Sequence, residues 1–471
     1  MKGQNRYKTR LFTKGANGDG NIGFPSDISS TIEFKEVTLI QNHTLEESKQ
    51  ILEMIEHIAS GRSSIIFSTR NNRVFVCGLN NYNQVGVANT ESIFLFKSIE
   101  HLLVDQLERA RVMEEMELTQ ALKLTNCSSH TESFLRERLY KKFEKVKSID
   151  FVEMGWFHSI VVINKNIVMG SGHSYFGQLY DHGFSEMHQY LRVVPYDYVS
   201  VINEIEDSGK LIDPFRQDKI THLSCGTFST TIVMNDTKVY SCGEITPFKK
   251  ELSFELDIQP FLGNDKILQV FHLDTGIAFY TSSECFIMLE KPDIYTRIEN
   301  VAKLVGGHLS NDTYYVLKDS PNTLRRWVST PSTDEPLSYS LSNIPSPFHF
   351  VPGYYHILCI SQGKYIYTDA SFLDEGVGVV DEEEDFELTL STLVGPKSQI
   401  GDKDTKLLTR LLLKEGYCVK KISSGSDFSF VLVYHESSKE QEEMKNKLHN
   451  QSSRRNSFID MSIVCLDFQL Y

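Results

Sequence analysis

The chain has 471 residues, of which 40% are hydrophobic and 11% are aromatic, so it can bury a large core. Charged residues make up 23% of the chain, and its formal net charge at pH 7 is −14. This acidity argues against broad attraction to nucleic acid or to anionic membranes, because both need a cationic surface.

The sequence has no apolar run near the roughly 18 to 20 residues that a membrane-spanning helix needs. Its polar start, MKGQNRYKTR, lacks the apolar core of a secretory signal. We therefore expect a protein of the cytoplasm or the nucleus that is not bound to a membrane. The eight cysteines lie far apart with no C-x-x-C pair, so we interpret most of them as small buried residues rather than metal ligands.

The first predicted elements are short apolar runs flanked by glycine-rich turns. Residues 11–23 carry the second half of this pattern, and residues 58–86 carry a full copy of it. Runs of three or four apolar residues are too short for helices and are typical of strands. The flanking glycines mark places where the backbone bends sharply. The recurring positions in these two copies are Gly15, Asn17, Gly20, Gly23, Gly61, Gly78, Asn80 and Gly86.

Residues 98–147 interrupt the pattern with helical periodicity. Apolar residues such as Leu103, Leu107 and Ala110 follow a helical stripe among many charges, and a second apolar set begins at Phe134. We interpret this segment as an α-helical insertion within the second repeat. Two arrangements are open: a helical pair laid on the side or face of the main fold, or an arm that binds a partner.

The clearest copy of the pattern is residues 151–180, FVEMGWFHSIVVINKNIVMGSGHSYFGQLY. Two apolar runs flank the turn Asn164-Lys165-Asn166, which suits a tight hairpin because asparagine tolerates positive φ. The repeat positions of this copy are Gly155, His158, Gly172, Gly177 and Gln178.

His158 lies between aromatic and glycine-rich segments, so it is a candidate functional residue. Other copies place Ser64, Ser229 or His356 at the same position. Because a shared catalytic role would not survive that variation, we interpret His158 as a hydrogen-bonding residue that fixes the inner turn.

The later copies become progressively degenerate. They fall at residues 223–243, 267–289, 304–328 and 350–367, and residues 422–433 carry only the first half. Half a unit at each end sums to one whole unit and gives seven in all. We therefore expect the array to close as a ring, in which an N-terminal strand completes the last unit. The repeat positions of these later copies are Gly226, Gly243, Gly353, His356 and Gly425.

The C-terminal part does not follow the pattern. Residues 436–461 are charged and polar and are expected to be flexible, and they include Ser457, a candidate phosphoacceptor because two arginines precede it. Residues 462–471 are strand-like. They compete with residues 10–14 for the third strand of the last unit, and we favour the N-terminal segment because it keeps the glycine pattern.

Motifs for catalysis are missing from the sequence. It contains no P-loop, H-E-x-x-H, G-x-S-x-G or kinase signature, and the loop histidines His173, His182 and His188 lack ligand-spaced carboxylates or thiols. We therefore predict no catalytic residue, metal or cofactor. One acidic run is a candidate site for a basic protein partner, and it consists of Asp381, Glu382, Glu383, Glu384 and Asp385.

The motif G-x-x-H-S, followed by two strands and G-x-N-x-x-G-Q-L-G, resembles the regulator of chromosome condensation repeat family. The match is strongest at residues 155–179 and good at residues 11–23 and 61–86. The resemblance implies an all-β fold, a seven-bladed β-propeller over residues 1–435 closed by N- and C-terminal strands. Signatures of WD and kelch repeats are absent.

The resemblance also bears on function. The best-known members of the family act on the GTPase Ran and bind chromatin, which implies a guanine-nucleotide exchange factor for a small Ran-like GTPase. The degenerate later copies prevent any exchange residue from being carried over. Our first hypothesis is instead a non-catalytic protein–protein interaction scaffold, not an enzyme, that is monomeric and presents variable loops to a protein partner. Functional residues are then expected where the copies differ.

Overall fold

The computed structural model describes most of the first three quarters of the chain and two strands near its end. The described residues are 7–87, 91–179, 183–191, 193, 196–215, 219–244, 251–273, 276–291, 294–306, 313–321, 323–326, 338–340, 348–352, 357–361, 365–368, 411–412, 415–426 and 428–435.

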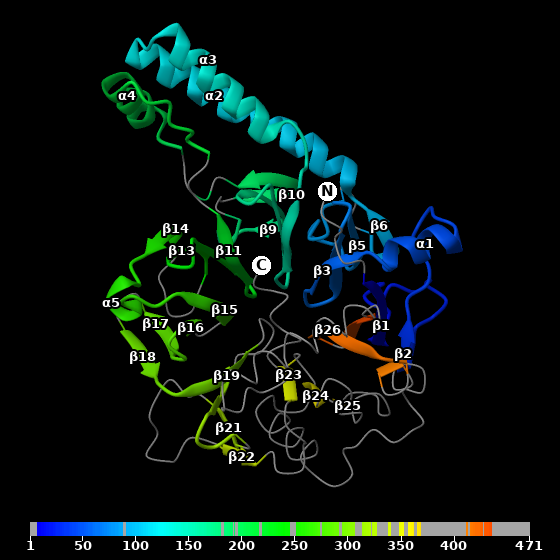
Figure 1. Ribbon diagram of the computed structural model, residues 1–471. Coiled ribbons are helices and arrows are strands. Elements are labelled where there is room, and N and C mark those ends of the chain that lie inside the picture. The colour runs from blue at the N-terminus through cyan, green and yellow to red at the C-terminus, as the bar shows by residue number, and fades with distance from the viewer. Residues whose placement is uncertain are drawn as a thin grey trace.

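The described strands form seven antiparallel sheets, which lie one after another around a common centre (Figure 1). The first sheet combines both ends of the chain: β1 (Lys8–Ala16), β2 (Ser30–Glu36), β26 (Tyr417–Ser424) and β27 (Phe428–His435). The next two are β3 (Ile55–Ser60), β4 (Ser64–Thr69), β5 (Val74–Gly78) and β6 (Ile93–Ser98), then β7 (Ile149–Met154), β8 (His158–Ile163), β9 (Ile167–Ser174) and β10 (Gly183–Leu191).

The remaining four sheets follow the same up-and-down order. They are β11 (Ile220–Cys225), β12 (Ser229–Met234), β13 (Lys238–Gly243) and β14 (Glu251–Leu256); β15 (Ile267–Leu273), β16 (Gly276–Thr281), β17 (Phe286–Lys291) and β18 (Ile294–Ile298); β19 (Val301–Gly306), β20 (Thr313–Leu317), β21 (Thr323–Arg326) and β22 (Ser338–Ser340); and β23 (Phe348–Pro352), β24 (Ile357–Ser361) and β25 (Tyr365–Thr368). The fold is thus mostly β, as the sequence predicts.

The central hairpin of each well-preserved sheet follows from its residue types. Strand β8 is fully buried and pairs with β9, with Ile163 opposite Ile167. The turn between these strands places Asn164 and Lys165 at φ values of 50° and 76°. Two successive residues at positive φ give the turn a twist that matches the strands, and asparagine accepts this conformation more readily than most residues.

Six of the sheets share a β-bulge that the sequence pattern does not predict. In the first strand of each, the register with its neighbour shifts near the start of the strand, for example between Ile149 and Phe151 and between Ile220 and His222. The same shift occurs in β3, β15, β19 and β26. A bulge increases the local twist of a strand, so its recurrence shows that these sheets are copies of one unit.

Neighbouring sheets are joined by a repeated backbone hydrogen bond. The N–H of Ile220, at the start of β11, donates to the Lys165 carbonyl in the preceding hairpin turn at 3.0 Å. Ile267 donates to Asp236 at 2.8 Å, and Val301 donates to Glu284 at 2.9 Å. At these three junctions, the first strand of a unit therefore docks on the hairpin turn of the unit before it.

The two ends of the described chain meet in one sheet. Strand β1 pairs antiparallel with β27, so that Lys8 lies opposite His435 and Gly15 lies opposite Phe428. The N-terminal segment thus occupies the third place in the sheet begun by β26 and β27. Residues 462–471, the alternative considered for this place, lie outside the described residues.

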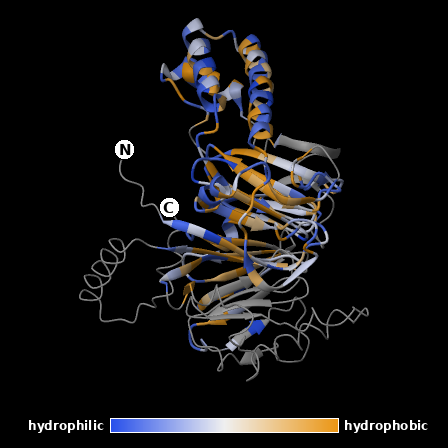
Figure 2. Ribbon diagram, turned by 90° about the vertical axis from the view of Figure 1, so that its right-hand side faces the viewer, coloured by the Kyte–Doolittle hydropathy of each residue, from blue (hydrophilic) through white to orange (hydrophobic). Residues whose placement is uncertain are grey.

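Three helices project from the sheets as an arm, which stands off the strands in Figure 1 and Figure 2. They are α2 (Glu100–Thr125), α3 (Ser129–Phe143) and α4 (Tyr198–Ser208). The first two occupy the segment in which the sequence shows helical periodicity. The prediction that they lie within the second repeat is wrong, because β6 already completes that sheet and the helices fall between β6 and β7. In contrast to the apolar strands, the arm carries alternating polar and apolar bands. Two short helices, α1 (Leu45–Leu52) and α5 (Gln259–Leu262), lie elsewhere.

A buried carboxylate holds the arm together. Glu114 of α2 is fully buried and accepts hydrogen bonds from the hydroxyls of Tyr190 and Tyr198, at 2.8 and 2.7 Å. Burial and the Glu114 carboxylate both raise the pKa of Tyr198, so its hydroxyl stays protonated. Because Tyr190 lies in β10 and Tyr198 begins α4, one side chain links the helix to a sheet and to a second helix.

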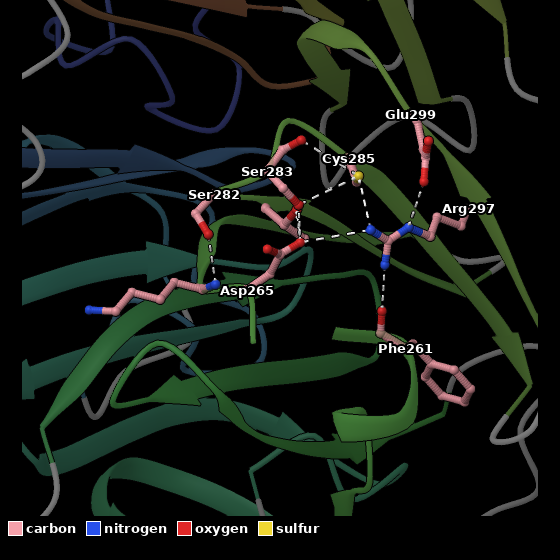
Figure 3. A network of polar contacts seen from close by, with 9 residues as sticks. Phe261, Asp265, Ser282, Ser283, Cys285, Arg297 and Glu299 are labelled. Carbon is pink, nitrogen blue, oxygen red and sulfur yellow. Dashed lines mark hydrogen bonds and ion pairs between the residues drawn. The ribbon is translucent and has the colours of Figure 1, made fainter. Parts of the chain in front are cut away.

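A polar network secures the outer strand β18 (Figure 3). Arg297 of β18 donates to the Phe261 carbonyl at 2.9 Å and to Cys285 Sγ at 3.2 Å. Its guanidinium also lies 3.9 Å from Asp265, which accepts a hydrogen bond from Thr281 at 3.1 Å. These contacts fix β18 against the turn between β16 and β17, and we interpret them as structural.

Candidate protein-docking surface

The inner turns that carry the G-x-x-H-S pattern have the same geometry in four copies. The N–H of the glycine donates to the carbonyl three residues later: Gly61 to Ser64 at 2.9 Å, Gly155 to His158 at 2.9 Å, Gly226 to Ser229 at 2.8 Å and Gly425 to Phe428 at 2.8 Å. The repeat predicted from sequence therefore corresponds to one recurring turn in these four copies.

Close approach between turns explains why Gly155 is a glycine. A Cβ atom there would lie 2.3 Å from the Gly226 carbonyl oxygen in the next sheet and 2.3 Å from the His158 ring. A Cβ atom on Gly61 would likewise lie 2.4 Å from the Gly155 carbonyl oxygen. Real Cβ contacts are never this short, so these positions need glycine for adjacent units to meet.

His158 lies fully buried between two sheets. Its Nε2 atom is 3.0 Å from the hydroxyl of Thr230, which itself donates to the Gln178 carbonyl at 2.9 Å. Since the hydroxyl proton is used on Gln178, Nε2 must be the donor to Thr230. The imidazole thus connects β8 to β12, and its burial leaves no access for a substrate. In the last unit the ring of Phe428 packs on Gly425 in the corresponding way.

The second recurring turn type lies at the end of the third strand of the unit. Gly78, Gly172 and Gly243 have φ values of 107°, 113° and 95°, closed to most other residues. Asn80 stabilises its loop by donating to the Val87 carbonyl at 2.9 Å. Asn17 likewise donates to the Ile28 carbonyl at 2.8 Å, and Gln178 accepts from the Phe176 N–H at 3.1 Å. Positive φ values are also found at Gly15, Gly20, Gly23, Gly86 and Gly177. Gly353 and His356 lie outside the described residues.

Aromatic side chains occupy the variable positions of these two turn types and form one continuous group, here called the aromatic surface. Phe157 lies at its centre, with ring centroids 5.1 Å from Tyr82 and 5.8 Å from Phe228. Phe176 lies 4.5 Å from Phe228. The full set comes from three adjacent sheets and consists of Tyr82, Trp156, Phe157, His173, Tyr175, Phe176 and Phe228.

The aromatic surface is accessible to solvent. Tyr175 is 57% exposed and Tyr82 is 40% exposed, and the other rings are partly buried. The guanidinium of Arg62 lies 4.8 Å from the centroid of the Trp156 ring, at one end of the group. Monomeric proteins seldom expose contiguous apolar groups of this kind except where something binds.

The His173 ring lies between the two exposed tyrosines. Its centroid is 5.3 Å from Tyr82 and 6.1 Å from Tyr175. Burial lowers the pKa of His173, so the ring is mostly neutral at pH 7. Gln178 lies within hydrogen-bond distance of its Nδ1 atom, at 3.2 Å. The middle of the aromatic surface is therefore uncharged.

The structure does not describe the other sites considered from sequence. The acidic run from Asp381 to Asp385 and the candidate phosphoacceptor Ser457 both lie outside the described residues. Within the described residues, no group of three or more His, Cys, Asp or Glu side chains could hold a metal ion. No helix in that part of the chain is long and apolar enough to cross a membrane.

The aromatic surface was not predicted from the sequence, although the sequence has aromatic residues at the variable positions of the repeat. Trp156, Phe157 and Phe228 all occupy the two variable positions of the G-x-x-H-S turn in adjacent copies. Aligning the copies and examining the variable positions alone would have found them. The contribution of Tyr82 depends on how neighbouring sheets pack.

Comparison with known proteins identifies the type of repeat. A model of the regulator of chromosome condensation (RCC1) repeat matches residues 55–84. No curated protein matches the chain. The resemblance to this repeat family is therefore confirmed.

Solved structures show the same fold. Prp20p from Saccharomyces cerevisiae aligns with a TM-score of 0.53 and 11% identity, over 94% of this chain and 95% of its own. Yeast RCC1 (Prp20) bound to Kap60 gives 0.54 and 12%, over 94% and 92%. Human WBSCR16 gives 0.51 and 12%, over 90% and 98%. The chain thus shares the fold of RCC1-like proteins across nearly its whole length.

Proposed function

We propose that this chain is a non-catalytic protein-interaction scaffold that docks a protein partner on the aromatic surface. The observation that carries the proposal is the placement of seven contacting aromatic rings at the variable positions of an otherwise repeated framework. Tryptophan, tyrosine and arginine dominate the binding energy of protein interfaces, and Trp156, Tyr82, Tyr175 and Arg62 all lie here.

A rigid framework supports this role. We infer that the seven sheets are the blades of one closed propeller. Most neighbouring first strands touch, since β3 contacts β7, β7 contacts β11, β11 contacts β15, β19 contacts β23, β23 contacts β26, and β26 contacts β3. The pairing of β1 with β27 joins the two ends. A closed ring leaves few exposed sheet edges and holds its loops in fixed positions.

The scaffold proposal is tested with the double variant Trp156→Ala/Tyr175→Ala. Loss of these two aromatic anchors is expected to weaken partner binding by about 1,000-fold, because such residues each contribute about 2 kcal/mol. Quantitative affinity capture compares partners retained by the wild-type chain and by the variant. Thermal melts confirm that the variant folds.

The matched control is Tyr295→Ala. Tyr295 is 42% exposed on the outer strand β18 and stacks on Phe261, away from the aromatic surface. The control is expected to retain the same partners as the wild-type chain. If the double variant also retains every partner at wild-type levels, the aromatic surface is not the docking site.

A second candidate function is guanine-nucleotide exchange on a small Ran-like GTPase. It is favoured by the fold shared with Prp20p, a protein described with binding to Gsp1p and histones. Exchange by a wedge that opens the nucleotide site requires no catalytic triad, so missing enzyme motifs do not oppose it. Release of fluorescent GDP from a panel of purified small GTPases tests it, and no acceleration with any of them would reject exchange.

The compartment proposed for this scaffold is the nucleus or the cytoplasm. The proposal rests on the expectation from the sequence and on the RCC1-like fold. Fluorescence imaging of the tagged full chain tests it, and a signal confined to a membrane-bound organelle or to the medium would contradict it.

A further inference from the structure

The arm helix α2 buries one side and exposes the other. Leu103, Leu107 and Ala110 are at most 2% exposed, on the side that packs against α3, α4 and β10. On the opposite side, Val112 is 44% exposed and Met116 is 70% exposed. Most surface helices are polar on their outer side, so these two side chains need an explanation.

The two apolar residues lie between opposite charges on one stripe. Asp105, Val112, Met116 and Lys123 follow one another at intervals of 7, 4 and 7 residues, and such intervals return to the same face of an α-helix. From its N-terminal to its C-terminal end, the stripe is acidic, apolar, apolar and basic. When a second copy of the helix runs antiparallel to the first, each charge of the stripe therefore faces a charge of opposite sign.

The charges on this stripe are available to a partner. Asp105 and Lys123 are exposed, and neither forms an ion pair with another described residue. By contrast, the charges on the side that faces α3 are used within the arm, where Arg111 pairs with Glu108 and with Glu115. The outward stripe is thus the unpaired part of the helix.

We propose that α2 is a homodimerisation surface, on which α2 of a second copy lies antiparallel. Asp105 then faces Lys123 of the second copy, and Val112 faces its Met116, with both contacts repeated by symmetry. Such an arrangement is an isologous interface around a two-fold axis. A second copy is the occupant that fits because the stripe is complementary to itself.

The position of the stripe along the helix favours this pairing. The residue numbers of each facing pair sum to 228, so the two-fold axis passes at the level of residue 114. The midpoint of α2 (Glu100–Thr125) lies close to it, between residues 112 and 113. The two helices therefore overlap from residue 103 to residue 125, about 34 Å at 1.5 Å per residue. The tip of each arm reaches the base of the other.

The dimer is weak and extends the proposed scaffold. Its apolar contact is small and its ion pairs are exposed, so we expect a dissociation constant on the order of 10 μM. It replaces the monomer expected from the sequence. Two aromatic surfaces in one assembly would strengthen binding to a partner with repeated sites through avidity.

Charge exchange tests the proposal with the full chain. Sedimentation equilibrium over about 1 to 200 μM is expected to show a monomer–dimer equilibrium. Asp105→Lys alone and Lys123→Asp alone each place like charges opposite one another, and each is expected to weaken the dimer about tenfold. An equimolar mixture of these two variants restores it, because every facing pair is then opposite in charge.

Two further variants complete the experiment. Met116→Glu is expected to abolish the dimer, whereas Leu124→Gln, which is 70% exposed but lies off the stripe, leaves it unchanged. Circular dichroism checks that each variant folds. A wild-type chain that is monomeric throughout this range overturns the proposal. So does a dimer that ignores the changes at residues 105, 116 and 123, or a mixture that fails to restore association.

Discussion

Single residues decide how closely the repeated units approach. The glycines at the inner turns lie against the carbonyl of the next turn, so their role depends on a neighbour in space rather than on their own sheet. The recurrent histidine acts in the same way, since His158 reaches Thr230 of the next unit. The most regular residues of the sequence therefore serve the framework, and the irregular ones form the aromatic surface.

Gly155→Ala is expected to destabilise the protein strongly. Its new Cβ atom would lie 2.3 Å from the Gly226 carbonyl oxygen, so two sheets must move apart, at a cost of about 2 to 4 kcal/mol. Gly18→Ala is the control, because nothing lies within 4 Å of a Cβ atom there. Chemical denaturation measures both. Equal stability of the two variants would contradict the close-approach explanation.

His57 is expected to make stability depend on pH. The side chain lies in β3 with its ring 6.3 Å from that of Phe151. Burial, helped by the charges of Lys420 and Lys421 and opposed by those of Glu56 and Asp150, lowers its pKa from 6.5 to about 4. Between these values the unfolded chain binds a proton that the folded chain does not, so stability is lost as the pH falls from 6.5 to about 4.

The variant His57→Gln removes this contribution. Relative to the wild-type chain, we expect a flatter dependence of the free energy of unfolding on pH, by about 3 kcal/mol between pH 6.5 and 4. Denaturation curves at several pH values measure the difference. Parallel curves for the two proteins would show that His57 titrates alike in both states.

At the scale of elements, one hairpin turn fastens the arm to the sheets. Asn164 lies between β8 and β9, and its side chain accepts from the Lys147 N–H at 2.7 Å and donates to the Lys145 carbonyl at 2.9 Å. The ammonium of Lys142 in α3 donates to the Asn164 carbonyl at 3.1 Å. The turn thus holds the segment by which the arm returns to the sheets.

Asn164→Ala is expected to loosen this junction. The change removes these hydrogen bonds and the two longer ones that the side chain makes to the Ser148 N–H and the Lys142 carbonyl. It also leaves alanine at a φ of 50°, and together these losses cost about 2 kcal/mol. Asn164→Gly relieves the backbone strain but restores no hydrogen bond, so it should be intermediate. Limited proteolysis is expected to cut the alanine variant faster near residues 144–148. Equal cleavage of all three proteins would argue against this role.

At the scale of the whole molecule, the closed ring that we infer depends on the pairing of β1 with β27. Lys8 lies directly opposite His435 in the antiparallel pair of β1 and β27. A short turn can therefore join the C-terminal end of β27 to the start of β1 without moving either strand. Strand β1 completes the sheet of β26 and β27 although it comes from the other end of the chain. A hairpin that links β27 directly to β1 should therefore leave the sheet intact.

A circular permutant tests this conclusion. We join His435 to Lys8 through a two-residue turn and open the chain at residues 88–90, between β5 and β6. The permutant is expected to fold with a melting temperature within a few degrees of the wild-type chain, since every strand pair is kept. A control lacking residues 8–16 should lose cooperative unfolding. Failure of the permutant to fold while that deletion folds would contradict the closure.

The sequence alone determined the repeat and much of the fold, because glycines at fixed spacing and short apolar runs encode local turns and strands. It also marked residues 98–147 as helical, and the structure has α2 and α3 within that segment. Only the tertiary structure decided which side chains meet. The aromatic surface joins Tyr82, Phe157 and Phe228 from three sheets, and the α2 stripe is defined by what α3 and α4 leave uncovered. Such contacts depend on the packing of whole units, which no local pattern records.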